Sequence, residues 1–333
     1  MTNETFAGYS NLALYSAMAV FLVAMICNAV YLAGLVPSRD RRRDAGAERE
    51  LVAAGTAGGA GGAPAATGAR TAARAGDDGP GVDAPAKARK AAGIASTMTW
   101  LGALLLVVSV ALRGLSVDRW PLGNMFEFAV MASMFTSLAY CVWSTRRDLR
   151  WLGLFITGPL LLVLGMAVTV WYTQAAELLP SLKSYWLVIH VTVAVIAMAI
   201  FTLGAVASVL YLVKDAFQRS GRASILDRFP SAESMERTSY GLHIVAFPLW
   251  TFTLIAGAIW ARQAWATYWN WDPKEVWTFV IWVVYAAYLH SRATSGISRQ
   301  VANWIALAGY VCLILNFTVV NVFFVGQHSY SGL

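Results

Sequence analysis

Residues 185–213 read YWLVIHVTVAVIAMAIFTLGAVASVLYLV. This run of 29 residues contains no Asp, Glu, Lys or Arg, and an α-helix needs about 20 such residues to cross the hydrocarbon core of a bilayer. The whole chain shares this character, because 58% of its 333 residues are hydrophobic and 13% are charged, whereas about a quarter are charged in soluble proteins. The sequence therefore predicts an all-α fold, a polytopic membrane helix bundle.

Apolar runs long enough to span a membrane recur along the chain, and we expect about eight transmembrane helices. They lie at 11–36, 94–113, 121–143, 152–172, 185–213, 240–260, 276–291 and 301–325. The seventh is short, so its start is expected to merge with the preceding loop. The first is too long for the core of a signal peptide and follows no basic residue, so we expect it to be retained.

The basic residues predict how the helices are oriented, because Lys and Arg accumulate on the cytoplasmic side. Eight spans that start from an outer N-terminus leave 20 of the 25 Lys and Arg in the four inner segments. Both termini are then expected on the outer side of the cytoplasmic membrane. The net charge of +7 follows from this asymmetry and does not indicate nucleic-acid binding.

Composition divides the chain into three parts: an N-terminal transmembrane helix (1–36), a disordered Ala/Gly-rich cytoplasmic linker (37–93) and a larger transmembrane domain (94–333). The three cysteines lie in apolar runs without a CxxC or CxxCH motif. This pattern argues against a disulfide framework, a zinc finger, a thioredoxin site and haem attached covalently to this chain.

Half of the tryptophans are concentrated in one outer segment. Seven of the fourteen are Trp250, Trp260, Trp265, Trp269, Trp271, Trp277 and Trp282. An aromatic belt at the membrane interface is one explanation, but a belt would enrich many helix ends equally. We therefore interpret the loop at 260–277 as a surface on which a large planar ligand stacks.

Two cations and a helix start accompany these tryptophans. Asp272, Pro273 and Glu275 have the spacing of a capping box, which predicts that a helix begins here. Arg262 and Lys274 could contact carboxylates of the ligand or simply lie at the interface; the residues themselves leave both possibilities open.

The chain contains four histidines, with two expected at each face of the membrane. His190 and His328 fall on the outer side and His243 and His290 on the inner side. Two neutral imidazoles on opposite sides of a ring are what a six-coordinate haem iron requires, whereas a zinc site needs further ligands. The pattern favours haem over zinc.

Residues 94–333 resemble a known family, most strongly from residue 240 onward. The matching strings are Phe247-Pro248-Leu249, Gly257-Ala258-Ile259-Trp260-Ala261, Tyr268-Trp269-Asn270-Trp271-Asp272-Pro273-Lys274-Glu275-Val276-Trp277, Tyr288-Leu289-His290 and His328-Ser329-Tyr330. They resemble the system II cytochrome c biogenesis proteins of the CcsA/CcsB/ResC type, which belong to the haem-handling superfamily with a WWD domain. Asn124, Phe126 and Glu127 resemble another outer motif of the family.

The resemblance implies roles for the histidines. His190 and His328 would bind an outer haem together with the Trp-rich loop, and His290 would bind an inner haem opposite a ligand from a ResB/CcsB-type partner. His243 is not part of the family pattern; we expect it to be structural, with a second inner ligand as the alternative. Ala266 stands where the family usually has Gly.

The resemblance further implies that haem b is a cargo that this chain transports and presents for covalent attachment to the CxxCH motif of apocytochrome c. Attachment adds each thiol across a haem vinyl group, and whether the chain is itself an enzyme or one component of a cytochrome c synthase complex stays open. A thioredoxin-like thiol reductase is a further expected partner. The alternatives are a membrane cytochrome in electron transfer, with bis-His haems, and a transporter without haem.

Overall fold

The computed structural model describes residues 3–35, 85–176, 183–222 and 224–328, and the statements below concern these residues. Within them all regular structure is helical, which confirms the predicted fold class. The α-helices are α1 (Glu4–Ala33), α3 (Ala86–Val117), α4 (Met125–Ser144), α5 (Gly153–Thr169), α6 (Thr192–Arg219), α7 (Ala232–Trp265), α8 (Pro273–Ala293), α9 (Arg299–Phe317) and α10 (Val319–Phe323). Two 3-10 turns (η1, Arg150–Leu152, and η4, Ile225–Arg228) and a π-helical turn (η3, Leu187–Val191) complete them.

Seven helical segments are long and apolar enough to cross a membrane, so the chain is a multi-pass helical membrane protein. Helix α8, which contains the run expected at 276–291, has 21 residues but is not among the seven. Its end turns carry Lys274, Glu275, His290 and Arg292, which lower its mean hydropathy. At a rise of about 1.5 Å per residue its length still matches a hydrocarbon core of about 30 Å.

Most of the expected linker, residues 37–93, lies outside the described residues. Its last part is helical, because α3 begins at Ala86, about two turns before the run expected at 94–113. Alanine has the highest helix propensity, and the Ala88 side chain lies so close to Gly34 that a Cβ at Gly34 would be 2.7 Å from it. The small residues thus let α1 and α3 pack closely at this end.

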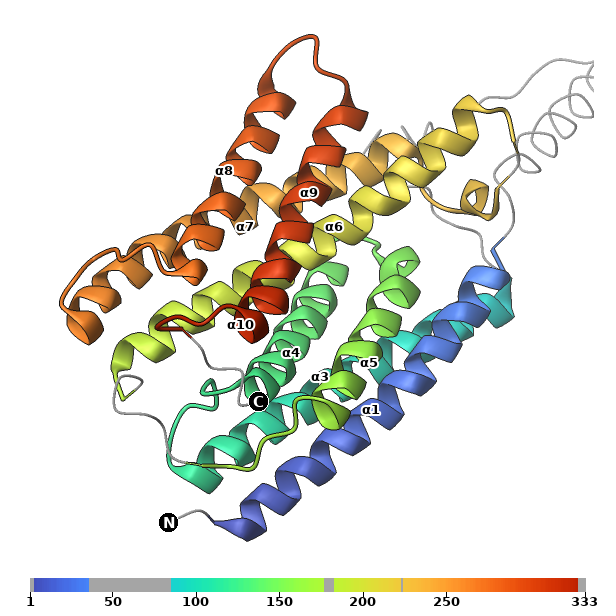
Figure 1. Cartoon of the computed structure of the whole chain (residues 1–333). Coiled ribbons are helices and arrows are strands. Elements are labelled where there is room, and N and C mark those ends of the chain that lie inside the picture. Colours follow the sequence, from blue (N-terminus) through green and yellow to red (C-terminus); the bar gives the residue numbers. More distant parts are fainter. Residues whose placement is uncertain (1–2, 36–84, 177–182, 223, 329–333) are drawn as a thin grey trace, which may run out of the picture.

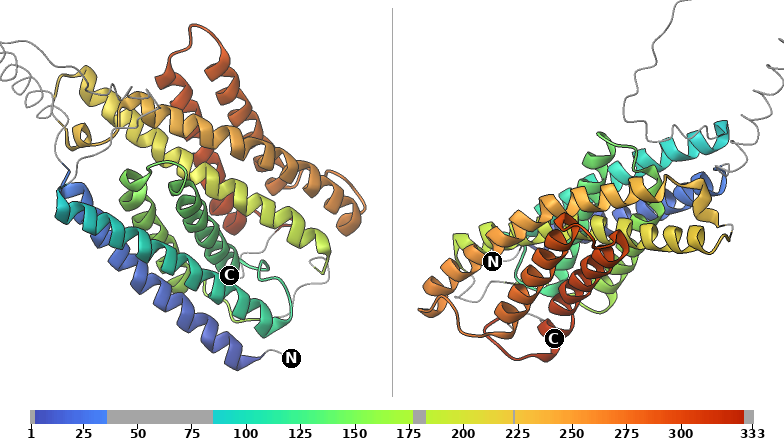
Figure 2. Two further views of the ribbon diagram at one scale, coloured as in Figure 1. Left: turned by 180° about the vertical axis from the view of Figure 1, so that it is seen from behind. Right: turned by 90° about the horizontal axis from the view of Figure 1, so that it is seen from above.

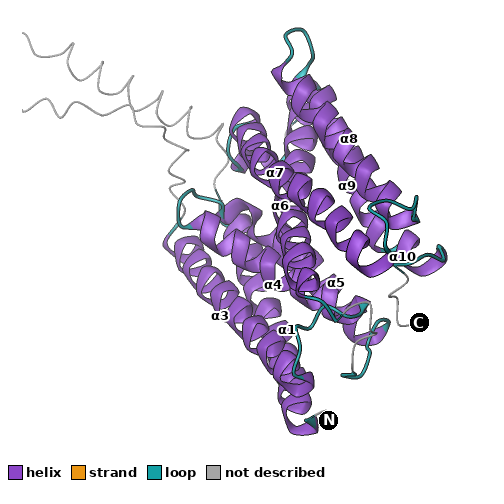
Figure 3. Cartoon of the chain, turned by 90° about the vertical axis from the view of Figure 1, so that its left-hand side faces the viewer, coloured by secondary structure: helices purple, strands orange, loops and turns teal. Residues whose placement is uncertain are grey.

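The helices form two edges with a central group between them. Helices α1 and α3 lie side by side at one edge, α8 and α9 lie side by side at the other, and α4, α6 and α7 run between these pairs (Figures 1 and 3). Helix α4 is the most buried of the seven candidate spans. Its first residues, Met125, Phe126 and Glu127, are buried. Met125 also lines the cavity that is described in the next section.

Helices α6 and α7 lie side by side, and two glycines let them approach each other (Figure 2). Gly204 of α6 lies under the imidazole of His243, where a Cβ would be 2.6 Å from Cε1. Gly257 of α7 lies in the same way under His190, where the distance would be 2.7 Å. Each glycine makes room for an imidazole from the facing helix.

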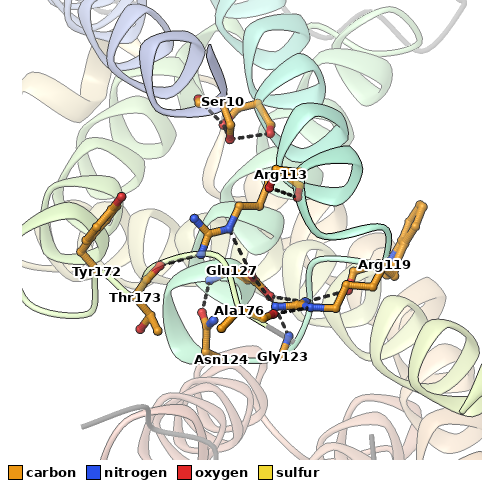
Figure 4. A network of polar contacts seen from close by, with 12 residues as sticks. Ser10, Arg113, Arg119, Gly123, Asn124, Glu127, Tyr172, Thr173 and Ala176 are labelled. Carbon is orange, nitrogen blue, oxygen red and sulfur yellow. Dashed lines mark hydrogen bonds and ion pairs between the residues drawn. The ribbon is translucent and has the colours of Figure 1, made fainter. Parts of the chain in front are cut away.

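A buried ion cluster joins the loops at the end where α4 begins. The Glu127 carboxylate accepts hydrogen bonds from Arg113 Nε at 3.1 Å and Arg119 Nη1 at 2.8 Å (Figure 4). The two guanidinium groups also donate to the carbonyl oxygens of Thr173 and Ala176. Because Glu127 belongs to the first turn of α4, the cluster fixes this helix end against the loops after α3 and α5.

Candidate functional site

A cavity lies at the end of the bundle where α4 begins and α7 ends. It has about 1300 Å³ of empty space, including the open solvent at its mouth. Its wall comes from the starts of α4 and α8, the π-helical turn η3, the second half of α7, and α9 with the residues that follow it. Most lining side chains are aromatic or aliphatic, so the cavity suits a large apolar ligand with a few polar contacts.

His190 lines this cavity from the π-helical turn η3. Such turns insert one extra residue into a helix and occur frequently at functional sites. Nδ1 of His190 lies 2.9 Å from the carbonyl oxygen of Thr253. A carbonyl oxygen only accepts, so Nδ1 carries the proton and Nε2 keeps its lone pair, the form in which imidazole binds a metal.

His328 lines the same cavity from the C-terminal side of the chain. Its Nδ1 lies 2.9 Å from Oδ1 of Asp272. The ionised carboxylate accepts a hydrogen bond from Nδ1, which leaves Nε2 as the nitrogen with the lone pair. The two histidines expected on the outer side thus converge on one cavity with the same tautomer, each oriented by an acceptor behind it.

Asp272 has two functions in the structure. The predicted capping box is present, because the Asp272 side chain caps the start of α8 and Glu275 accepts from the backbone N–H of Asp272. Oδ2 of Asp272 also accepts from the backbone N–H of Gln327 at 2.6 Å. Burial raises the pKa of Asp272, but the hydrogen bonds with His328 and the backbone outweigh burial and hold this pKa below its ordinary value.

The tryptophans predicted to meet a planar ligand separate into two groups. Trp260, Trp265 and Trp269 line the cavity, whereas Trp271 and Trp277 do not. The ring centroid of Trp260 is 5.7 Å from that of His190, and Trp265 is 4.7 Å from His328. Aromatic rings therefore flank both imidazoles.

The loop that carries these rings turns at two residues with left-handed backbone. Ala266 ends α7 with φ 63°, and Trp271 has φ 59° and is 77% exposed. Glycine adopts this conformation without a steric penalty. The helix thus ends at Ala266 in a conformation that glycine would adopt more readily.

The two cations of the loop have different surroundings. Lys274 lines the cavity, and its Nζ donates to the carbonyl oxygen of Asn316 at 2.6 Å. Arg262 does not line it; its guanidinium donates to the carbonyl of Ala266 and lies 6.0 Å from the ring centroid of Tyr268, which does line the cavity. Lys274 is the better placed of the two to meet a carboxylate in the cavity.

Two buried polar atoms of the cavity residues lack hydrogen-bond partners in the described structure. These are Oε1 of Glu275 and Oδ1 of Asn316. A buried polar group without a partner costs about 1–3 kcal/mol, so these atoms point to a polar group or water that occupies the cavity. Both atoms are acceptors, so they call for a donor such as water, which an ionised haem propionate is not. The part of the site that fits a haem, with its metal and flat apolar ring, is the pair of imidazoles within the aromatic wall.

The other two histidines do not line the cavity. His243 is 0% exposed, its Nδ1 lies 2.7 Å from the carbonyl oxygen of Ser239, and its Nε2 has no partner among the described residues. Its ring contacts those of Phe201, Tyr285 and Tyr288. His290 lies in the last turn of α8 and is exposed.

Sequence reasoning missed several residues of the cavity. Thr253 and Gly257 are one turn apart on α7 and support His190, and Asn316 and Asn321 add polar contacts from the last helices. Asn124, a residue of the outer family motif to which the sequence assigned no role, caps α4 and lines the cavity. Of these residues, only Thr253 and Gly257 have a spacing, four residues, that places them on a common helix face. This spacing is the one signal in the sequence that could have identified two of the missed residues together.

The fold and the cavity define a class: a polytopic helical membrane protein that presents two imidazoles among aromatic rings at one end of its bundle. The chain belongs to the cytochrome C assembly protein family, whose model matches residues 101–328. This family membership confirms the resemblance to system II proteins of the CcsA type.

The relatives include cytochrome c biogenesis proteins CcsA. That of Chlamydomonas reinhardtii is 33% identical over 248 residues, 73% of this chain and 69% of that protein. That of Guillardia theta is 30% identical over 263 residues, 71% of this chain and 84% of that protein. Among solved structures, the cytochrome c haem lyase CcmF has a similar fold, with a TM-score of 0.57 and 16% identity over 95% of this chain and about half (47%) of that chain.

Proposed function

We propose that this chain binds haem in the cavity between His190 and His328 and presents it for cytochrome c maturation. Family membership supports haem handling for the maturation of apocytochrome c, and it gives no support to the alternative of an electron-transfer cytochrome. The observation that carries the proposal is the convergence of two imidazoles, each with Nδ1 held by an acceptor, on one aromatic cavity.

Each part of the site has a task in this function. The haem, most simply haem b as cargo, supplies the iron and the vinyl groups that react with CxxCH thiols. Nε2 of His190 and of His328 would bind the iron, and Trp260, Trp265 and Trp269 would cover the ring. The ammonium group of Lys274 would pair with a propionate.

The remaining residues of the loop would act at the mouth of the cavity. Trp271 does not line the cavity and is largely exposed, which suits contact with an incoming apocytochrome. Arg262 would hold Tyr268, a residue of the cavity wall, and Trp277 would pack below the loop in α8.

The distribution of basic residues supports an orientation with the Trp-rich loop on the extracytoplasmic side of the cytoplasmic membrane and both termini outside. The haem-handling domain would be residues 94–333, tethered to the N-terminal helix by the linker. At the inner face the exposed His290 would share an inner haem with a ResB/CcsB-type partner, and a thioredoxin-like reductase would keep the CxxCH thiols reduced. His243, buried among aromatic rings, would be structural.

The direct test is haem retention after single substitutions. We expect His190→Ala and His328→Ala to lose most of the haem from the outer site and cytochrome c maturation with it. Added imidazole should restore the six-coordinate absorption spectrum in both variants, because it replaces the missing ligand. His243→Ala removes an imidazole outside the cavity and should retain haem.

Two results would contradict the proposal. One is full haem content and maturation in both cavity variants. The other is a loss that imidazole does not restore and that His243→Ala reproduces, because such a loss reports general unfolding.

A further inference from the structure

A second cavity lies at the opposite end of the bundle from the histidine pair. It has about 720 Å³ of empty space, including its mouth. Helices α1, α3 and α4 and the turn before α5 form its wall, with Asn28, Ser96, Tyr140 and Ser144 among the lining residues. Nothing in the proposed haem function uses this cavity.

A buried amide marks the floor of this second cavity. Asn28 is 3% exposed, and its Nδ2 has no hydrogen-bond partner among the described residues. The side chain is fixed from behind, because it packs against Gly153 of α5. An amide N–H₂ is a donor, so a group that satisfies it must be an acceptor.

The mouth of the cavity carries an excess of positive charge. Arg146, Arg147 and Arg150 line it against a single carboxylate, Asp148, which pairs with Arg150 at 2.6 Å. In the described part of the chain no ion pair involves the exposed Arg146 or Arg147. Two guanidinium groups and a buried amide are the donor set of an anion site, and phosphate oxygens suit it well.

The position of the cavity indicates where the phosphate comes from. Arg146 and Arg147 follow Thr145, the residue that ends the apolar helix α4, and this places them at the level of lipid head groups. Apolar side chains on the neighbouring turns, Ile94 of α3 and Val142 of α4, are 50% and 55% exposed and face hydrocarbon in a bilayer. A phosphate at this depth is part of a phospholipid.

We propose that this cavity binds the head group of an anionic phospholipid from the leaflet at that face. The phosphate contacts Arg146 and Arg147 at the mouth and Nδ2 of Asn28 at the floor. The bound lipid joins α1 to the turn between α4 and α5, and so stabilises the half of the bundle that lies away from the histidine pair.

The test compares lipids on the purified full chain in a neutral detergent. We expect dioleoyl-phosphatidylglycerol to raise the melting temperature of the wild type and dioleoyl-phosphatidylcholine to have little effect. In Arg146→Gln/Arg147→Gln the affinity for phosphatidylglycerol should fall about tenfold or more, because two charge-assisted contacts are lost. Arg222→Gln/Arg237→Gln, two exposed arginines elsewhere on the basic side, is the matched control and should bind as the wild type does.

A second variant tests the floor. Asn28→Leu keeps a similar volume and removes the donor, so it should weaken phosphatidylglycerol binding without changing the net charge. Exposed arginines tolerate substitution, so the mouth variant remains informative even if Asn28→Leu fails to fold. Equal losses in the mouth variant and its control, or no loss in the mouth variant, would overturn the proposal. Equal stabilisation by inorganic phosphate alone would overturn the assignment to a lipid.

Discussion

Nδ1 of His328 lies 2.9 Å from a carboxylate oxygen of Asp272, and the same carboxylate caps the first turn of helix α8. The start of a helix and the orientation of an imidazole are therefore coupled through one side chain. The lowered pKa of Asp272 keeps its carboxylate ionised through the neutral range, where it both caps the helix and accepts from the imidazole.

We predict that Asp272→Asn lowers haem affinity about 10–100-fold, the usual cost of changing a residue that orients a metal ligand. Asparagine is also a good N-cap, so the free energy of unfolding should change by less than about 1 kcal/mol. A haem titration followed by absorbance measures the affinity. Ser298→Ala, which removes the cap of α9 outside the cavity, is the control: it should lower stability by about 1 kcal/mol and leave haem affinity intact. Unaltered affinity in Asp272→Asn would show that the contact does not orient a ligand.

Gly257→Ala is predicted to displace His190. The added Cβ would lie 2.7 Å from Cε1 of the imidazole, closer than real Cβ contacts, so the ring must move away from its acceptor Thr253. We expect haem retention to fall several-fold while the helix itself is preserved, since alanine has the better helix propensity.

The matched control is Gly241→Ala on the same helix, where a new Cβ meets nothing within 4 Å. It should keep haem and raise stability by up to about 1 kcal/mol. Equal haem content in both alanine variants would mean that His190 has freedom to shift without consequence.

These relationships show what the sequence can and cannot predict. The capping box at Asp272 was predicted because its partner Glu275 is three residues away and the chemistry is local. The contact of Asp272 with His328 joins residues 56 positions apart, and the support of His190 by Gly257 depends on how α6 packs on α7. The pattern of apolar and polar residues along a helix does not predict either of these long-range contacts.

The Trp-rich loop illustrates the same limit. Its composition predicted that aromatic rings gather at one face, and three of them line the cavity. Composition did not separate Trp269, which lines it, from Trp271, two residues later, which points outward. The left-handed backbone at Trp271 turns its side chain away from the direction of Trp269. The number and spacing of tryptophans do not predict such a local backbone conformation.

Ala266→Gly is predicted to stabilise the protein. Ala266 ends α7 with a left-handed backbone, and this conformation costs about 1–2 kcal/mol for a residue with a Cβ. Glycine also loses more freedom on folding, so the net gain in the free energy of unfolding should be up to about 1 kcal/mol.

The neighbouring change Ala264→Gly lies inside the helix and should have the opposite sign, a loss of about 1 kcal/mol. Chemical denaturation in a fixed detergent measures both variants. If the two glycine variants destabilise equally, the left-handed conformation at Ala266 carries no strain.

Glu127→Gln is predicted to be strongly destabilising. The Glu127 side chain is 0% exposed and pairs with Arg113 at 3.1 Å and with Arg119 at 2.8 Å. Removing its charge leaves two buried guanidinium groups with no counter-ion from Glu127, and breaking a buried pair in this way costs about 3–5 kcal/mol.

Asp148→Asn is the matched control, because its pair with Arg150 is about half exposed on both sides and such pairs contribute about 0–1 kcal/mol. Denaturation curves would distinguish the two cases, and a Glu127→Gln variant within 1 kcal/mol of the wild type would show that the cluster does not hold the end of α4. Asn124 caps α4 and lines the cavity, so a change at this helix end also reaches the cavity wall. Glu127→Gln should therefore lower haem retention as well, whereas Asp148→Asn should not.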